Sequence, residues 1–197
     1  ISGTACDHWN RYEEDFDLLQ SLHLNAYRFS IEWSRIEPEE GKFDEQAIEH
    51  YRRMFESLRR RGIEPFVTLW HWTNPTWGES HYGGWENPEV GEKFVRFVER
   101  VVTEYKDLAR YWTIFNEPNT FVGHGYVQAN RPPARRSLFR ARRAIKNFMR
   151  THHAAYAAIH RLDPNAQVVL SHFLVSMRPF RNKWISRLII PALDYIR

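Results

Sequence analysis

Four short apolar runs, separated by longer segments with helical spacing, restrict the folds open to this chain. The runs occupy residues 26–31, 65–70, 111–115 and 167–171 and are rich in β-branched and aromatic side chains. They lack a regular alternation of polar and apolar residues, which is typical of strands buried on both faces of a parallel sheet. Parallel strands require crossover connections, so the pattern predicts an α/β fold built from right-handed β–α–β units.

The segments between these runs carry helix signals. Asp44 stands where an N-cap is expected, Asn87 precedes a proline suited to the first helical turn, and Gly62 is typical of a left-handed helix end. A further helix is expected over residues 12–22. In the last helix we expect the apolar residues at helical spacing to form one buried stripe. Its members are Leu138, Ile145, Phe148, Met149, His152, Tyr156 and Ile159.

The number of strands sets the class of α/β fold. No glycine-rich phosphate loop follows any of the runs, so a nucleotide-binding doubly wound sheet loses its main support. A (β/α)8 barrel remains, but a complete one typically needs about 250 residues. We therefore predict a partial (β/α)8 TIM barrel with about half of its strands. No linker-like stretch divides the chain, so residues 1–197 are expected to form a single domain.

The cysteine content and the apolar stretches exclude several classes of protein. Cys6 is the only cysteine, so neither an internal disulfide nor a thiolate zinc site can form. We expect no cofactor and no metal ion, and a reducing, cytoplasmic location. Charged residues interrupt every apolar stretch before it reaches 18 residues, so no membrane partner is expected.

The positive charge is concentrated in one segment. Residues 119–162 contain nine lysine and arginine side chains and no acidic residue, while the whole chain has a formal net charge of +4. Arg136, Arg140, Arg143 and Arg150 lie opposite the predicted apolar stripe, which favours a solvated outer face. A nucleic-acid binder is therefore the weakest hypothesis, and no nucleic-acid partner is expected.

Candidate catalytic groups follow the predicted strands, where the active site of a barrel lies. Glu117 comes directly after the third run, and His71 stands between Trp70 and Trp72 at the end of the second. A solvated glutamate in a turn and a core histidine among packing aromatics are the alternatives.

Arg28 is a cation inside the first run. A buried arginine needs a carboxylate partner, and the candidates are Glu32, Glu117 or an acid outside this chain.

Several separated motifs, in this order, resemble the N-terminal half of family 1 glycoside hydrolases, the β-glucosidase and β-galactosidase family. They are Ala-Cys-Asp-His-Trp at 5–9, Asn-Ala-Tyr-Arg-Phe-Ser-Ile-Glu-Trp-Ser-Arg-Ile at 25–36, Gly-Ile-Glu-Pro-Phe-Val-Thr-Leu at 62–69, His-Trp at 71–72, Gly-Gly-Trp at 83–85 and Phe-Asn-Glu-Pro at 115–118.

The resemblance implies retaining hydrolysis of terminal β-linked sugars in oligosaccharides or in aryl and alkyl β-glycosides. By its place in the Asn-Glu-Pro motif, Glu117 resembles the general acid/base, and Asn116 the donor to the sugar 2-hydroxyl. His71 matches the glycone-binding histidine, with Trp72 beside it. Arg28 matches the arginine that pairs with the nucleophile. Retention requires two carboxyl groups about 5–5.5 Å apart.

The sequence also departs from the family pattern. The Thr-Glu-Asn-Gly motif of the nucleophile does not occur, nor does the first strand with its glycone-binding glutamine. The usual His-Trp-Asp-Leu-Pro motif reads His-Trp-Thr-Asn-Pro at 71–75. At 132–134, where Pro-Pro-Gly is usual, Ala134 replaces the glycine. The alternative hypothesis is a catalytically inactive half-barrel that binds carbohydrate, or assembles with itself or with a complementary half.

Overall fold

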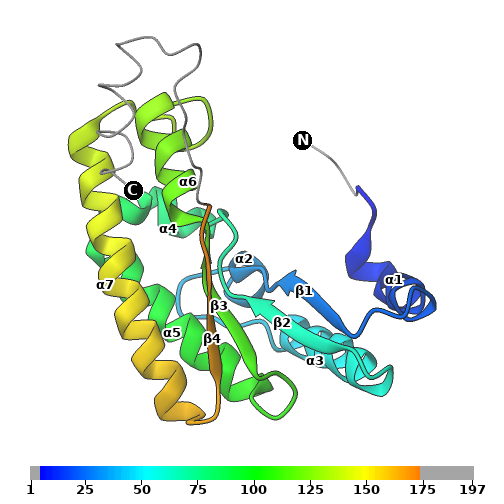
Figure 1. The fold of residues 1–197 in the computed structure, drawn as a ribbon. Helices are drawn as coiled ribbons and strands as arrows, with labels where there is room; N and C mark the ends of the chain where they lie inside the picture. Colours follow the sequence, from blue (N-terminus) through cyan, green and yellow to red (C-terminus); the bar gives the residue numbers. More distant parts are fainter. Residues whose placement is uncertain (1–4, 174–197) are drawn as a thin grey trace, which may run out of the picture.

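The described part of the computed structural model, residues 5–173, contains one parallel sheet of four strands in the order β1-β2-β3-β4 (Figure 1). The strands are β1 (Ala26–Ser30), β2 (Glu64–Thr68), β3 (Tyr111–Asn116) and β4 (Gln167–Ser171). All three neighbouring pairs are parallel. The predicted α/β fold and partial barrel are confirmed.

Helices connect the strands and cover one side of the sheet (Figure 1). The long ones are α1 (His8–Ser21), α3 (Glu45–Arg60), α5 (Pro88–Tyr105) and α7 (Leu138–Leu162). Shorter ones are α2 (Trp33–Ile36), α4 (Thr76–Ser80), η1 (Gly84–Glu86), α6 (Pro118–Val122) and η2 (Gly123–Gln128). No helix in residues 5–173 is both long and apolar enough to cross a membrane.

The predicted helix ends are confirmed where they depend on local chemistry. The Asp44 carboxylate accepts the backbone N–H groups of Gln46 and Ala47 at 2.8 and 3.1 Å, and α3 begins there. The Asn87 side chain accepts the Glu89 N–H at 3.0 Å at the start of α5. Gly62 has a φ of +69° after α3, a conformation that costs glycine little.

The core consists largely of aromatic side chains packed between the sheet, α5 and α7. Trp85 stacks on Phe148 at 4.4 Å between ring centroids and meets Phe115 edge-on at 5.2 Å. Trp70 also meets Phe115 edge-on, at 5.6 Å. These offset and edge-to-face arrangements are the favoured ones for aromatic pairs. Much of the high aromatic content therefore stabilises the fold and leaves few rings for a ligand.

The predicted buried stripe of α7 is wrong in part. Phe148 and Ile159 are buried, but Leu138, Ile145, Met149 and Tyr156 are exposed. On its buried side α7 presents mainly small residues, which allow it to approach α5 closely. They are Ala141, Ala144, Ala155 and Ala158.

The exposed side chains of α7 continue onto the edge strand. Ile145 and Met149 line a cavity of about 420 Å³ together with Leu170 of β4. We call these three residues the α7–β4 face. Nothing else in residues 5–173 covers it, which is why the larger apolar residues of α7 are exposed.

Burial also differs among the strands. β3 is almost entirely buried and β2 is buried or half-buried along its length, whereas β1 and β4 are largely exposed or half-buried. The expectation of burial on both faces thus holds only for the two central strands. Each outer strand has one strand neighbour in the described part of the chain, so less of its surface is covered.

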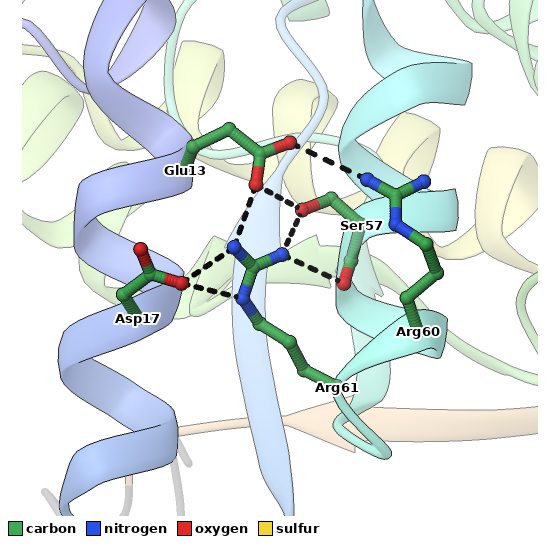
Figure 2. A network of polar contacts seen from close by, with 5 residues as sticks. All are labelled: Glu13, Asp17, Ser57, Arg60 and Arg61. Atoms are coloured by element: carbon green, nitrogen blue, oxygen red, sulfur yellow. Dashed lines mark hydrogen bonds and ion pairs between the residues drawn. The ribbon is translucent and has the colours of Figure 1, made fainter.

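A polar network attaches α1 to α3. Phe16 is the one fully buried residue of α1. The network comprises Glu13, Asp17, Ser57, Arg60 and Arg61 (Figure 2). Arg61, whose side chain is 15% exposed, pairs with Glu13 at 2.7 Å and Asp17 at 2.5 Å. The fully buried Ser57 donates to Glu13 at 2.8 Å. The polar network therefore adds to the aromatic packing of Trp9 and Phe16 in fixing the N-terminal helix against α3 and β1.

Candidate active site

Arg28 links three neighbouring strands at the carboxyl end of the sheet. From β1, its Nε donates to Thr68 Oγ1 of β2 at 3.0 Å, and its Nη2 donates to Asn116 Oδ1 of β3 at 2.6 Å. Of the three candidate carboxylate partners, Glu32 and Glu117 make no ion pair with Arg28 in residues 5–173, which leaves an acid outside the described residues. Arg28 is exposed on its outer strand, and in residues 5–173 its guanidinium bonds to two neutral acceptors.

Asn116 is the most buried of the predicted site residues, at 4% exposure. Its Oδ1 accepts a second hydrogen bond from Ser171 Oγ at 3.1 Å. Its backbone carbonyl accepts the indole N–H of Trp72 at 2.9 Å. The amide therefore sits at the centre of a network that reaches all four strands.

Glu117 follows Asn116 in a left-handed conformation, with φ 43° and ψ 57°. Its N–H donates to the Ser171 carbonyl at 3.0 Å, and its own carbonyl accepts the Phe121 N–H at 3.1 Å as α6 begins. Such a conformation is strained for a residue with a Cβ, and strained residues gather at functional sites. Trp72 has a similar backbone, with φ 76°. The two predicted site residues thus share an unusual backbone.

His71 lies beside the first strand, with its Nδ1 3.1 Å from Ser30 Oγ. Loss of solvent lowers the pKa of His71, and the positive charge of Arg28 lowers it further; Glu117 and Glu32 act in the opposite direction. The net shift is downward, so the imidazole is neutral at pH 7. A neutral ring carries one donor and one acceptor for the hydroxyl groups of a ligand.

We expect the imidazole signals of His71 to titrate with a midpoint below the ordinary histidine value of 6.5, as followed by NMR. Because the folded pKa is lowered, the stability that neutral His71 contributes is present above pH 6.5 and is lost as the pH falls through the folded pKa. Arg28→Met should move the midpoint upward, since it removes a charge that opposes protonation. A midpoint that stays fixed in the variant would contradict the placement of Arg28 beside His71.

Glu32 occupies a separate position beyond the end of β1. Its carboxylate accepts hydrogen bonds from Thr73 at 2.9 and 3.0 Å and from Ser34 at 2.9 Å. Thr73 stands where the resemblance leads one to expect an aspartate. A hydroxyl there binds Glu32, which an aspartate would repel.

A cavity of about 410 Å³ adjoins the network through Trp72. Phe121 and Pro133 supply apolar lining, and the Arg131 guanidinium lies 5.5 Å from the centre of the Trp72 ring. Arg135 anchors the loop that carries Arg131, through Glu86 at 2.7 Å and the Gly83 carbonyl at 2.8 Å. This cavity can hold an apolar or aromatic group beside Trp72, although its lining includes none of Arg28, His71, Asn116 and Glu117. A larger one of about 510 Å³ lies along β1 and contains none of Arg28, His71, Asn116 and Glu117.

Three members of the network were not predicted from the sequence. Ser30, Thr68 and Ser171 each lie at the last position of a strand. Ser30 pairs with Thr68 in the register of β1 and β2, and Asn116 pairs with Ser171 across β3 and β4. A small hydroxyl residue at the end of a strand, next to a predicted site residue, is the signal that could have found them.

The fold is part of a (β/α)8 barrel, with its polar side chains at the carboxyl ends of the strands. Residues 1–188 match the sequence model of Glycosyl hydrolase family 1. The chain belongs to this family, and the resemblance read from the motifs is confirmed.

Relatives and solved structures agree on the family. Beta-glucosidase 25 of Oryza sativa subsp. japonica is 42% identical over 135 residues, which are 68% of this chain and 27% of the relative. Beta-glucosidase A of Thermotoga maritima is 36% identical over 149 residues, 75% of this chain and 33% of the relative. The beta-glycosidase from Pyrococcus horikoshii superposes with a TM-score of 0.90 at 36% identity, covering 97% of this chain and 44% of that structure. The chain thus spans a third or less of the length of these curated relatives.

Proposed function

We propose that this chain supplies the acid/base and part of the sugar site of a retaining β-glycosidase. The observation that carries the proposal is the network of Arg28, Asn116, Trp72 and Ser171 around Glu117 at the carboxyl end of the sheet. The substrate class is a terminal β-linked sugar in an oligosaccharide or in an aryl or alkyl β-glycoside. The names of the relatives favour glucose as the sugar.

In this mechanism Glu117 donates a proton to the glycosidic oxygen as the bond to the sugar breaks. The cavity beside Trp72 receives the leaving group, and Asn116 and His71 hold hydroxyl groups of the sugar. Glu117 then removes a proton from the water that releases the sugar. Its half-buried side chain can serve both steps because it reaches substrate and solvent.

The nucleophile in this proposal is a carboxylate supplied by the remainder of the protein. It must come within about 5–5.5 Å of Glu117 and on the opposite face of the sugar. Arg28 is placed to favour its ionised form, since an adjacent guanidinium lowers the pKa of a carboxyl group. In residues 5–173 the guanidinium bonds only to a hydroxyl and an amide, so its charge is available for this role.

We also propose that a complementary C-terminal half, rather than a second copy of this chain, completes the barrel. The α7–β4 face and the outer edges of β1 and β4, which have no strand neighbour in residues 5–173, support an additional partner, because exposed apolar surface and open strand edges favour association. The exposed, free Cys6 favours a reducing compartment such as the cytoplasm.

The stereochemistry of the reaction tests this function. In the protein completed with a family C-terminal half, NMR of a β-glucoside digest should show β-glucose first and α-glucose only after mutarotation. Appearance of α-glucose as the first product would rule out the retaining mechanism. Binding of the sugar without any turnover would favour the inactive carbohydrate-binding half-barrel.

A further inference from the structure

Ser171 contacts two of the residues to which the proposed function gives direct roles, Asn116 and Glu117. Its hydroxyl donates to Asn116 Oδ1 at 3.1 Å, and its backbone carbonyl accepts the Glu117 N–H at 3.0 Å. It stands at the last position of β4, in register with Asn116 of β3. No motif of the sequence singles it out.

The chemistry of Arg28 determines which end of the Asn116 amide faces the network. A guanidinium can only donate, so the amide atom 2.6 Å from Arg28 Nη2 must be the oxygen. Ser171 Oγ must then be a donor as well, because that oxygen can only accept. Both bonds fill Oδ1 and turn Nδ2 away from them. No residue in 5–173 accepts a hydrogen bond from Nδ2, so its two hydrogens are free for a ligand.

The terminal torsion of asparagine is broad and roughly two-fold, so a single hydrogen bond restrains the amide weakly. Arg28 reaches across β2 from β1 and is itself held by Thr68, while Ser171 approaches from β4, on the other side of β3. Two donors from opposite sides define the amide plane better than either alone. Removal of the serine hydroxyl leaves Arg28 as the only restraint.

We propose that Ser171 is a positioning residue that keeps Asn116 Nδ2 directed at the 2-hydroxyl of the bound sugar. The inference rests on the proposed function, because it assumes a sugar beside Asn116. It predicts that Ser171 sets the preference for sugars that carry a hydroxyl at C2. It predicts no comparable effect on sugars that lack this group.

The test compares 4-nitrophenyl β-glucoside with its 2-deoxy analogue in the protein completed with a family C-terminal half. Ser171→Ala should lower the ratio of the two kcat/KM values roughly fivefold, the effect of one neutral hydrogen bond. Most of the loss should fall on the glucoside. Ser171→Thr, which keeps the hydroxyl, should restore most of the ratio. Thr113→Val removes another hydroxyl from the buried part of β3 and should leave the ratio unchanged.

An equal loss on both substrates in Ser171→Ala would overturn the inference, since it would show a structural role only. Turnover with an unchanged ratio would overturn it too, and would leave the glycosidase function standing. If the completed protein turns over neither substrate, calorimetry with glucose and 2-deoxyglucose decides. A preference for glucose that falls in Ser171→Ala then supports the inference without hydrolysis, while binding of neither sugar contradicts both proposals.

Discussion

Replacement of Glu117 by glutamine in the completed enzyme should reduce kcat/KM for alkyl β-glucosides by about 10²–10⁴-fold. Glutamine keeps the shape of the side chain but cannot donate a proton to the leaving oxygen. The backbone bonds of residue 117 to Ser171 and Phe121 do not involve the side chain, so the fold should survive.

The dependence on the leaving group separates lost acid catalysis from lost structure. A 2,4-dinitrophenyl glucoside needs little protonation as it leaves, so its first step should be much less affected by Glu117→Gln. Glu92→Gln, on the exposed side of α5, is the matched control and should retain full activity. A loss of the same size on both substrates would contradict the acid role of Glu117.

Arg96→Met should destabilise the chain by about 3 kcal/mol. Arg96 pairs with the Glu37 carboxylate, which is fully buried, and its removal leaves that charge without a cation. The loss of stability should lie at the low end of the range found when one partner of a buried ion pair is removed. Arg96 is 36% exposed, and Glu37 keeps the hydrogen bonds from Trp33 at 2.9 Å and the Gly41 N–H at 2.7 Å.

Urea unfolding followed by tryptophan fluorescence measures this change. Lys42→Met breaks an exposed pair with Glu39, in which both side chains are more than half exposed, and should leave the midpoint unchanged. If Arg96→Met behaves like Lys42→Met, then the buried carboxylate of Glu37 does not depend on its arginine.

The strands and helix ends could be predicted because local sequence determines them. Each strand begins within one residue of the predicted position, and Asp44, Gly62 and Asn87 act as the sequence indicates. The exposed side of α7 could not be predicted in the same way. Helical spacing shows which residues share a face, but the neighbouring elements decide which face is covered. Alanines that pack against α5 displaced Ile145 and Met149 from the expected buried position.

The residues of the candidate site could likewise be predicted from the sequence, but their partners could not. The strand positions and the motifs predicted Arg28, His71, Asn116 and Glu117, because each falls in or just after an apolar run. The partners of these residues depend on the register between strands, which the sequence does not state. Arg28 consequently bonds to Thr68 and Asn116, where the sequence led us to expect a carboxylate.

The central claim is that this chain carries the acid/base of a β-glycosidase and that another part of the protein carries the nucleophile. Its most direct test is the hydrolysis of 4-nitrophenyl β-glucoside by residues 1–197 alone and after addition of a family C-terminal half. We expect no measurable turnover by the chain alone, and turnover when the two halves are combined. Steady turnover by the chain alone that is lost in Glu32→Gln would contradict the account, because it would identify Glu32 as the second carboxylate.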